Sequence, residues 1–269
     1  MTKQKIGVLF SRAWKRSCDW KLNVFILLLS LIFYAPAGAV TWWRYFYRAG
    51  RAWTKPSEIA YWIVTTAVFS WLIGMLGLAG MREIVRQETS LRRGFASILP
   101  GWSAALTLVP WILLLVLPGC AAMHWQSEMM AEYEVLAGVI GWTIIPLTLF
   151  SLCMFMLLAA GRAAASTGTG ALYRNAFRAF RRGWGRWLIA LLILYPASVA
   201  ASLVLVPLGF AIDHSGSLWL GILLFIPQGI IFNWFMIFLG SVSAALYAEA
   251  AEASAAPDEP EPPQPSVGE

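Results

Sequence analysis

Residues 171–212 read ALYRNAFRAFRRGWGRWLIALLILYPASVAASLVLVPLGFAI, and this stretch decides the fold. Its first part, 171–187, mixes arginines with aromatic residues, and its second part, 188–212, contains no charged residue. An apolar run of about 20 residues is long enough to cross the ~30 Å hydrocarbon layer of a bilayer as an α-helix. The stretch therefore predicts a basic helix followed directly by a transmembrane helix.

Six apolar stretches of this kind occur in the chain, and we expect six transmembrane helices. They are Leu22–Val40, Ile59–Met81, Ala104–Met123, Val135–Ala160, Leu188–Ile212 and Leu218–Tyr247. The composition agrees, because hydrophobic residues make up 59% of the chain and charged residues only 13%, against ~25% charged residues in soluble domains. Strands are excluded as spanning elements, since the stretches are too long and do not alternate. The predicted fold class is all-α, a polytopic membrane helix bundle.

Basic residues are concentrated on one side of the predicted membrane. Sixteen of the 20 lysines and arginines fall in the N-terminal stretch and in the connections that follow the second and fourth spans. The other four, Arg44, Arg48, Arg51 and Lys55, fall in the first loop on the opposite side. The positive-inside rule then predicts both termini in the cytoplasm. A cleaved signal peptide, with Leu22–Tyr34 as its apolar region and Ala37-Gly38-Ala39 as its cleavage site, is disfavoured, because the region before it is long and patterned like two later segments.

The basic segments predict a pseudo-threefold repeat of amphipathic helix, span, loop and span. Each segment has apolar residues at the spacing of one helix face and cations on the other face. The three apolar faces are Ile6, Phe10, Ala13, Trp14 and Ser17; Ile84, Leu91, Phe95, Ile98 and Trp102; and Tyr173, Phe177, Phe180, Trp184 and Trp187. Gly183 and Gly185 weaken the third helix and are expected to mark its junction with the following span.

Cations of these three helices are the candidate contacts to lipid headgroups. They are Arg12, Lys15, Arg16, Arg86, Arg93, Arg174, Arg178, Arg181, Arg182 and Arg186. In such a helix the aromatic side chains enter the headgroup boundary and the cations face phosphates and water. Each cation near an anionic leaflet contributes about 1 kcal/mol. Simple anchoring and specific binding of a lipid or a partner protein both remain open, whereas nucleic acid is not expected as a partner.

Reactive groups are scarce in this sequence, and we expect no catalytic, cofactor-binding or metal-binding residue. No Asp, Glu, Lys, Arg or His lies well inside a predicted span, which disfavours ion-coupled carriers and pumps. His124 and His214 lack the spacing of a zinc site. No nucleophile elbow or phosphate-binding glycine motif is present. Cys18, Cys120 and Cys153 form no CxxC pair and are interpreted as packing thiols.

The chain divides into a six-helix transmembrane domain, residues 1–247, and a tail, residues 248–269. The tail contains six acidic residues, five prolines and no lysine or arginine. Such a composition buries too little apolar surface to fold, so we expect the tail to be disordered. Screening of the basic faces, partner binding and simple solvation are all compatible with its charge.

Three short motifs carry a resemblance to known proteins: Ser11-Arg12-Ala13-Trp14, Leu172-Tyr173-Arg174-Asn175-Ala176-Phe177-Arg178 and, in the last span, Ala244-Ala245-Leu246-Tyr247. Over most of residues 5–248 the chain resembles a loose set of bacterial six-span proteins, and this resemblance implies a place in a bacterial cytoplasmic (inner) membrane. The set comprises the YciC-like group and the membrane domain associated with some glycerophosphodiester phosphodiesterases. Proteins of this kind mostly lack an assigned function. Because no soluble phosphodiesterase domain is present, the resemblance implies no catalytic residues.

These observations predict a non-catalytic integral membrane protein rather than an enzyme. We expect it to organise lipids, anionic ones in particular, or partner proteins through its cytoplasmic basic helices. The alternative is a carrier or channel for a small or amphipathic solute, built from the spans that prolines interrupt. A continuous polar cavity through the bundle would favour the alternative.

Overall fold

The computed structural model describes residues 6–32, 56–86, 88–115, 134–164, 168–215 and 218–255, and all regular secondary structure in these ranges is helical. The elements are α1 (Ile6–Ser17), a helix at Trp20–Ile32, α3 (Pro56–Val85), α4 (Leu91–Ala96), the 3-10 turn η1 (Leu99–Gly101), α5 (Trp102–Ala105), α7 (Glu134–Ala164), α8 (Thr169–Ser215) and α9 (Leu218–Ala255). For these residues the predicted all-α class is confirmed.

Three helices in the described part of the chain are long and apolar enough to cross a membrane. The segments are Val64–Val85 of α3, Pro146–Ala164 of α7 and Gly229–Ser254 of α9. They correspond to the second, fourth and sixth predicted spans. The stretch Leu188–Ile212 lies inside α8, and Trp20–Ile32 covers the described part of the first span. The count of six spans and the threefold repeat therefore stay predictions.

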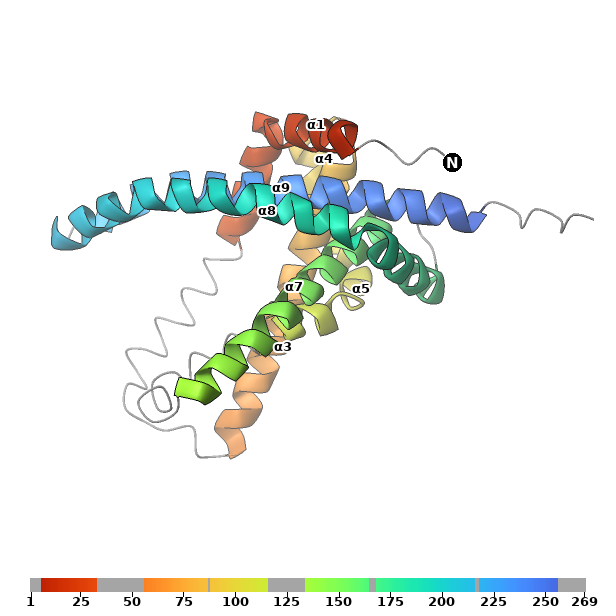
Figure 1. Ribbon diagram of the computed structural model, residues 1–269. Helices are drawn as coiled ribbons and strands as arrows, with labels where there is room; N and C mark the ends of the chain where they lie inside the picture. Colours follow the sequence, from red (N-terminus) through yellow and green to blue (C-terminus); the bar gives the residue numbers. More distant parts are fainter. Residues whose placement is uncertain are drawn as a thin grey trace, which may run out of the picture.

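The helices cross near one end of the molecule (Figure 1). There α3 and α7 lie side by side, and the antiparallel pair α8–α9 crosses them close to α1 and α4. The core lies at this crossing, where Leu78 of α3, Leu158 of α7, Leu172 of α8 and Leu239 of α9 are fully buried. Because burying such side chains contributes ~1.5–3 kcal/mol each, the crossing holds the molecule together.

Small side chains bring α8 and α9 close together. The buried face of α8 is Leu172, Ala176, Ala179, Gly183, Trp187, Ala190 and Leu194, at spacings of three or four residues. A Cβ added to Gly183 would lie 2.8 Å from Cδ2 of Leu246, so a larger residue there would force the Leu246 side chain to shift. Next to this contact, Nε1 of Trp187 donates a hydrogen bond to Oγ of Ser243 at 3.2 Å. Close backbone approach through small residues is typical of helix pairs in membranes.

The predicted junction between the third basic helix and its span is wrong. The helix α8 is continuous from Thr169 to Ser215, through both Gly183 and Gly185. Residues 183–188 contain no Ser, Thr, Asp or Asn, the residues that cap a new helix with a side-chain oxygen. Gly183 serves close packing against Leu246 instead of a helix end.

The second basic segment is not one amphipathic helix, as the sequence pattern suggested. It is divided among the end of α3, the short helix α4, η1 and α5. Pro100 lies in η1 and Gly101 ends it, and both residues disfavour a continuous α-helix. The third predicted span is also interrupted, because residues 106–108 form a turn between α5 and a helix that begins at 109. In that turn Oγ1 of Thr107 donates to the carbonyl of Ala104 at 2.7 Å.

The helical domain extends further than the predicted boundary at Tyr247. The helix α9 continues to Ala255, so the prediction of disorder is wrong for residues 248–255. Contacts with α8 explain the extension, since Ala250 is buried and Glu249 forms an ion pair with Arg186. Residues 256–269, the Arg44–Lys55 loop, His124 and Cys120 lie outside the described residues.

Candidate anion-binding cavity

Side chains of all three basic segments line one cavity of about 1190 Å³. Its charged residues are Arg12 and Arg16 of α1, Arg86 just after α3, Arg182 and Arg186 of α8, and Glu249 and Glu252 of α9. Its apolar lining includes Leu9, Ile84, Ala179, Ala245 and Leu246. We call this site the arginine cavity. Five arginines face two glutamates, so its lining has a net positive charge.

Three of the five arginines are paired with carboxylates of the protein. Nη1 of Arg186 lies 2.9 Å from Oε2 of Glu249. Arg86 pairs with Glu83, and Nη1 of Arg16 lies 2.6 Å from Oδ2 of Asp19. These pairs leave the charge of the three arginines largely compensated.

The other two arginines of the cavity, Arg12 and Arg182, are available to an external ligand. Both are exposed, and within the described ranges neither makes a hydrogen bond or an ion pair. A guanidinium group offers a planar fork of donors that fits a phosphate or a carboxylate. These two side chains therefore have the chemistry to bind an anion at the cavity.

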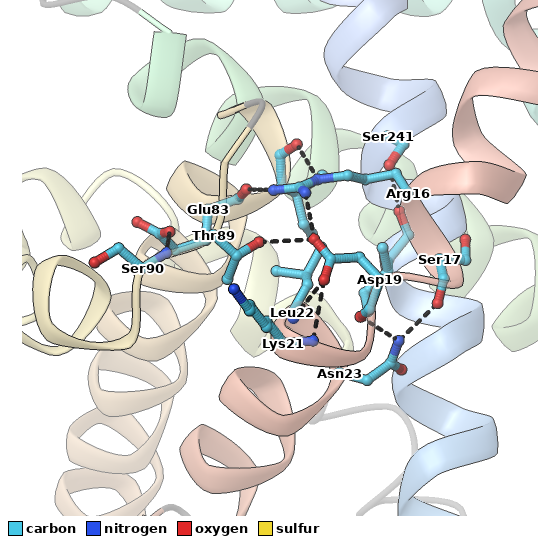
Figure 2. A network of polar contacts seen from close by, with 12 residues as sticks. Arg16, Ser17, Asp19, Lys21, Leu22, Asn23, Glu83, Thr89, Ser90 and Ser241 are labelled. Atoms are coloured by element: carbon cyan, nitrogen blue, oxygen red, sulfur yellow. Dashed lines mark hydrogen bonds and ion pairs between the residues drawn. The ribbon is translucent and has the colours of Figure 1, made fainter.

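Arg16 belongs to a polar network that fixes α1 to the end of α3 (Figure 2). Its Nε donates to the carbonyl of Ile84 at 3.3 Å, and its Nη2 donates to the carbonyl of Glu83. Carbonyls in the last turn of a helix lack partners within the helix, so Arg16 caps α3. Burial lowers the pKa of Arg16 while Asp19 and Glu83 raise it; the group stays charged at physiological pH.

Asp19 connects the same network to two further elements. Its Oδ2 also accepts a hydrogen bond from Oγ1 of Thr89 at 3.0 Å. Its Oδ1 accepts from the backbone N–H groups of Lys21 at 3.0 Å and Leu22 at 3.4 Å. The last two bonds are those of an N-cap, so Asp19 begins the helix Trp20–Ile32.

Glu83 is the fully buried acidic residue of this network. One carboxylate oxygen accepts from Arg86, and the other accepts from the backbone N–H of Ser90 at 3.0 Å. A buried carboxylate needs such partners to offset its loss of hydration. The sequence analysis missed Glu83. Its spacing to Arg86 is that of a helical ion pair, but its burial follows from the fold and not from a sequence pattern.

The remaining predicted headgroup contacts lie outside the lining of the arginine cavity. Lys15, Arg93, Arg174 and Arg181 are exposed. Arg178 is half-buried and donates to the hydroxyl of Ser254 in the last turn of α9. Half of the ten predicted contacts thus meet in the cavity, and contact with lipid stays a prediction for all ten.

Large aromatic side chains are exposed on the basic segments and the elements next to them. Trp14, Trp20, Trp102, Phe177 and Trp184 are each 47–69% exposed. Trp14 packs edge-on against Trp234 of α9, with ring centroids 4.9 Å apart. Exposed tryptophans are enriched where a membrane protein meets the headgroup layer. Of the predicted aromatic face of 171–187, Trp187 is instead buried against α9.

Comparison with known proteins leaves the geometry as the main guide to function. No protein-family model matches the chain, and neither a curated protein nor a solved structure is found that matches it. The resemblance to the YciC-like group therefore stays a prediction. In the described ranges, no group of three or more His, Cys, Asp or Glu side chains is placed to hold a metal ion.

Proposed function

We propose that the protein is a non-catalytic integral membrane protein that binds anionic lipid headgroups at the arginine cavity. In this role it organises lipids, or partner proteins through them, at the membrane surface. The observation that supports this most directly is the meeting of three basic segments around two arginines, Arg12 and Arg182, that have no partner among the described residues. Cations near an anionic leaflet contribute ~1 kcal/mol each.

The shape of the cavity suits a lipid better than a small inorganic anion. Arginines line it together with apolar side chains, including Leu9, Ile84 and Leu246. A phosphate at the arginines would leave glycerol and acyl carbons to contact this apolar lining. The exposed tryptophans would place the same end of the molecule at the headgroup layer.

The proposed topology has six spans with both termini in the cytoplasm of a bacterial cell. It is supported by the gathering of basic segments at one end and by the positive-inside rule. Reporters active in only one compartment, placed at Tyr133, Ser215 and the C-terminus, test it. We expect the first two outside and the last inside. A C-terminal reporter active outside the cytoplasm would refute the topology.

Lipid binding is tested with the full-length protein and vesicles of neutral or anionic phospholipid. We expect tighter binding to the anionic vesicles. The double variant Arg12→Gln, Arg182→Gln should weaken this binding by at most roughly 30-fold, the equivalent of ~1 kcal/mol per cation. The matched control is Arg92→Gln, Arg181→Gln, which removes the same charge from exposed positions outside the cavity lining.

Two outcomes would contradict the proposal. Equal loss of binding in both double variants would mean that the whole basic surface attracts lipid and the cavity has no special role. Equal affinity of the unaltered protein for neutral and anionic vesicles at low salt would mean that it does not select anionic lipid. Mass spectrometry of lipids that co-purify from native membranes identifies the headgroup.

A carrier or channel is the second candidate function. It is favoured by two buried polar atoms in the candidate spans, Oγ of Ser151 and Nδ2 of Asn233, which have no hydrogen-bond partner among the described residues. Prolines also lie inside two of the helices, Pro146 in α7 and Pro227 in α9. Solute flux into liposomes that Asn233→Leu abolishes would support this function. Absence of flux for ions and small amphipathic solutes would leave lipid binding as the better explanation.

A further inference from the structure

The last turn of α9 is held beside the arginine cavity. Ala253 lines the cavity, and α9 ends two residues later at Ala255. Between them, Oγ of Ser254 donates to Oδ1 of Asn175 at 3.0 Å and accepts from Arg178. Because this turn is fixed to α8, the following segment, residues 256–269, leaves the helix next to the cavity.

One of three regularly spaced arginines on α8 has no partner among the described residues, in a cavity whose lining also includes Glu252. Arg178, Arg182 and Arg186 are four residues apart and therefore share one face of the helix. Arg178 contacts Ser254, and Arg186 pairs with Glu249, both on α9. Arg182, between them, has no partner in the described part of the chain. An acidic side chain would fit there.

Segment 256–269 has the charge and the length to fill this position. It carries Asp258, Glu259, Glu261 and Glu269, five prolines and no lysine or arginine. A proline-rich chain extends by ~3.1 Å per residue, so Glu261 reaches about 19 Å beyond Ala255. The cavity wall on α9 begins at Ser241, and the rise from there to Ala255 is about 21 Å at ~1.5 Å per residue. If the segment folds back along α9, its first three acidic residues can therefore reach most of the cavity wall.

We propose that segment 256–269 docks in the arginine cavity of its own chain, with its acidic residues at Arg182 and Arg12. A short tether holds the segment at an effective concentration in the mM range. Ion pairs that are weak individually then suffice to fill the cavity. The docked segment occupies the site assigned above to anionic lipid, so the two compete; this competition, unlike the docking, rests on the proposed function.

Photo-cross-linking of the full chain in neutral detergent tests the docking. A benzoylphenylalanine placed at Gln264 should cross-link to the peptides that contain Arg12 and Arg182. The variant Arg12→Gln, Arg182→Gln should lower the yield by ~2–5-fold for each arginine removed, as expected for exposed ion pairs. The control Arg92→Gln, Arg181→Gln should keep the yield. The triple variant Asp258→Asn, Glu259→Gln, Glu261→Gln should lower it as well, with the helical domain unchanged.

Docking would be refuted by a yield that the triple variant leaves unchanged, or by cross-links spread evenly over the chain. Cross-links between isotopically light and heavy copies in a mixed sample would also refute it, because the tail would then bind a second molecule.

The competition between the tail and lipid has its own test. Removal of residues 256–269 should tighten binding to anionic vesicles and leave binding to neutral vesicles unchanged. Cross-links to the cavity without any vesicle binding would refute the proposed lipid binding and leave the docking supported. Vesicle binding without cross-links to the cavity would refute the docking and leave lipid binding supported.

Discussion

The first and third basic segments have the same sequence pattern and different structures. Both combine cations with aromatic residues at helical spacing, yet α1 ends at Ser17 whereas residues 169–187 continue into the apolar part of α8. One difference is that Asp19 caps a new helix after α1, whereas residues 183–188 contain no Ser, Thr, Asp or Asn. The helical spacing of apolar residues predicts that a helix exists. A capping residue such as Asp19 then separates it from the next helix along the chain.

The two segments also differ in what holds them to the rest of the molecule. The end of α1 is fixed to α3 through the buried polar network of Arg16, Asp19 and Glu83. The basic part of α8 is fixed to α9 mainly through small side chains and Trp187. Substitutions in the polar network at α1 and substitutions in the small-residue packing between α8 and α9 should therefore change the stability of the protein independently.

The largest effect is expected from Glu83→Ala, which removes the buried carboxylate under α1. The N–H of Ser90 and the guanidinium of Arg86 would lose their partner, and the free energy of unfolding should fall by about 3 kcal/mol. Reversible unfolding in mixed micelles measures this change. Glu88→Ala, at an exposed position nearby, should change it by less than ~0.5 kcal/mol. A loss below ~1 kcal/mol for Glu83→Ala would show that the carboxylate bonds to Arg86 and Ser90 contribute little, since the backbone carbonyl that accepts from Arg16 is kept in this variant.

An intermediate effect is expected from Asp19→Ala, which removes the N-cap that separates α1 from the next helix. Loss of an N-cap costs about 0.5–2 kcal/mol. Ser90→Ala is the matched control, because Ser90 precedes α4 and its side chain makes no capping hydrogen bond. Equal stability changes in the two variants, in the same unfolding assay, would contradict the capping role of Asp19.

The smallest effects, of opposite sign, are expected at two glycines of α8. Gly183→Ala places a Cβ against Leu246 and should destabilise the fold by about 1 kcal/mol, within the range known for overpacking. A Cβ on Gly185 meets no atom within 4 Å. Gly185→Ala should therefore stabilise the protein by up to ~1 kcal/mol through helix propensity. Stabilisation by both substitutions would mean that α8 and α9 do not pack closely at Gly183.

The sequence alone predicts the helical class and the positions of three apolar helices well, because hydrophobicity and length are local properties. The breaks between helices are predicted less well. The capping role of Asp19 is readable in the sequence, but the interruption at residues 97–108 depends on Pro100, Gly101 and a threonine that competes for a backbone carbonyl. The extension of α9 to Ala255 depends on contacts with α8, which composition cannot reveal.

For the candidate site, the sequence identifies the residue type and the region but not the arrangement. All five arginines of the cavity belong to the predicted set of cations. Which of them are paired depends on how the helices cross, since Glu83, Glu249 and Asp19 come from three different elements. The predicted aromatic face of 171–187 shows the same limit, because small residues at 176, 179 and 183 pack against α9 and leave Phe177 and Trp184 exposed.

The spacing of charges along α8 and α9 has a consequence for how the two helices find their register. Arginines recur at every turn of α8, so sliding α9 by one turn, ~5.4 Å, would exchange Arg186 for Arg182 as the partner of Glu249. Ion pairs alone therefore do not distinguish the two alignments. The close contact at Gly183 and the hydrogen bond from Trp187 to Ser243 each fit one alignment only. Together with the hydrogen bond from Ser254 to Asn175, these contacts select one alignment of the hairpin, while the ion pair supplies an attraction that either alignment could use.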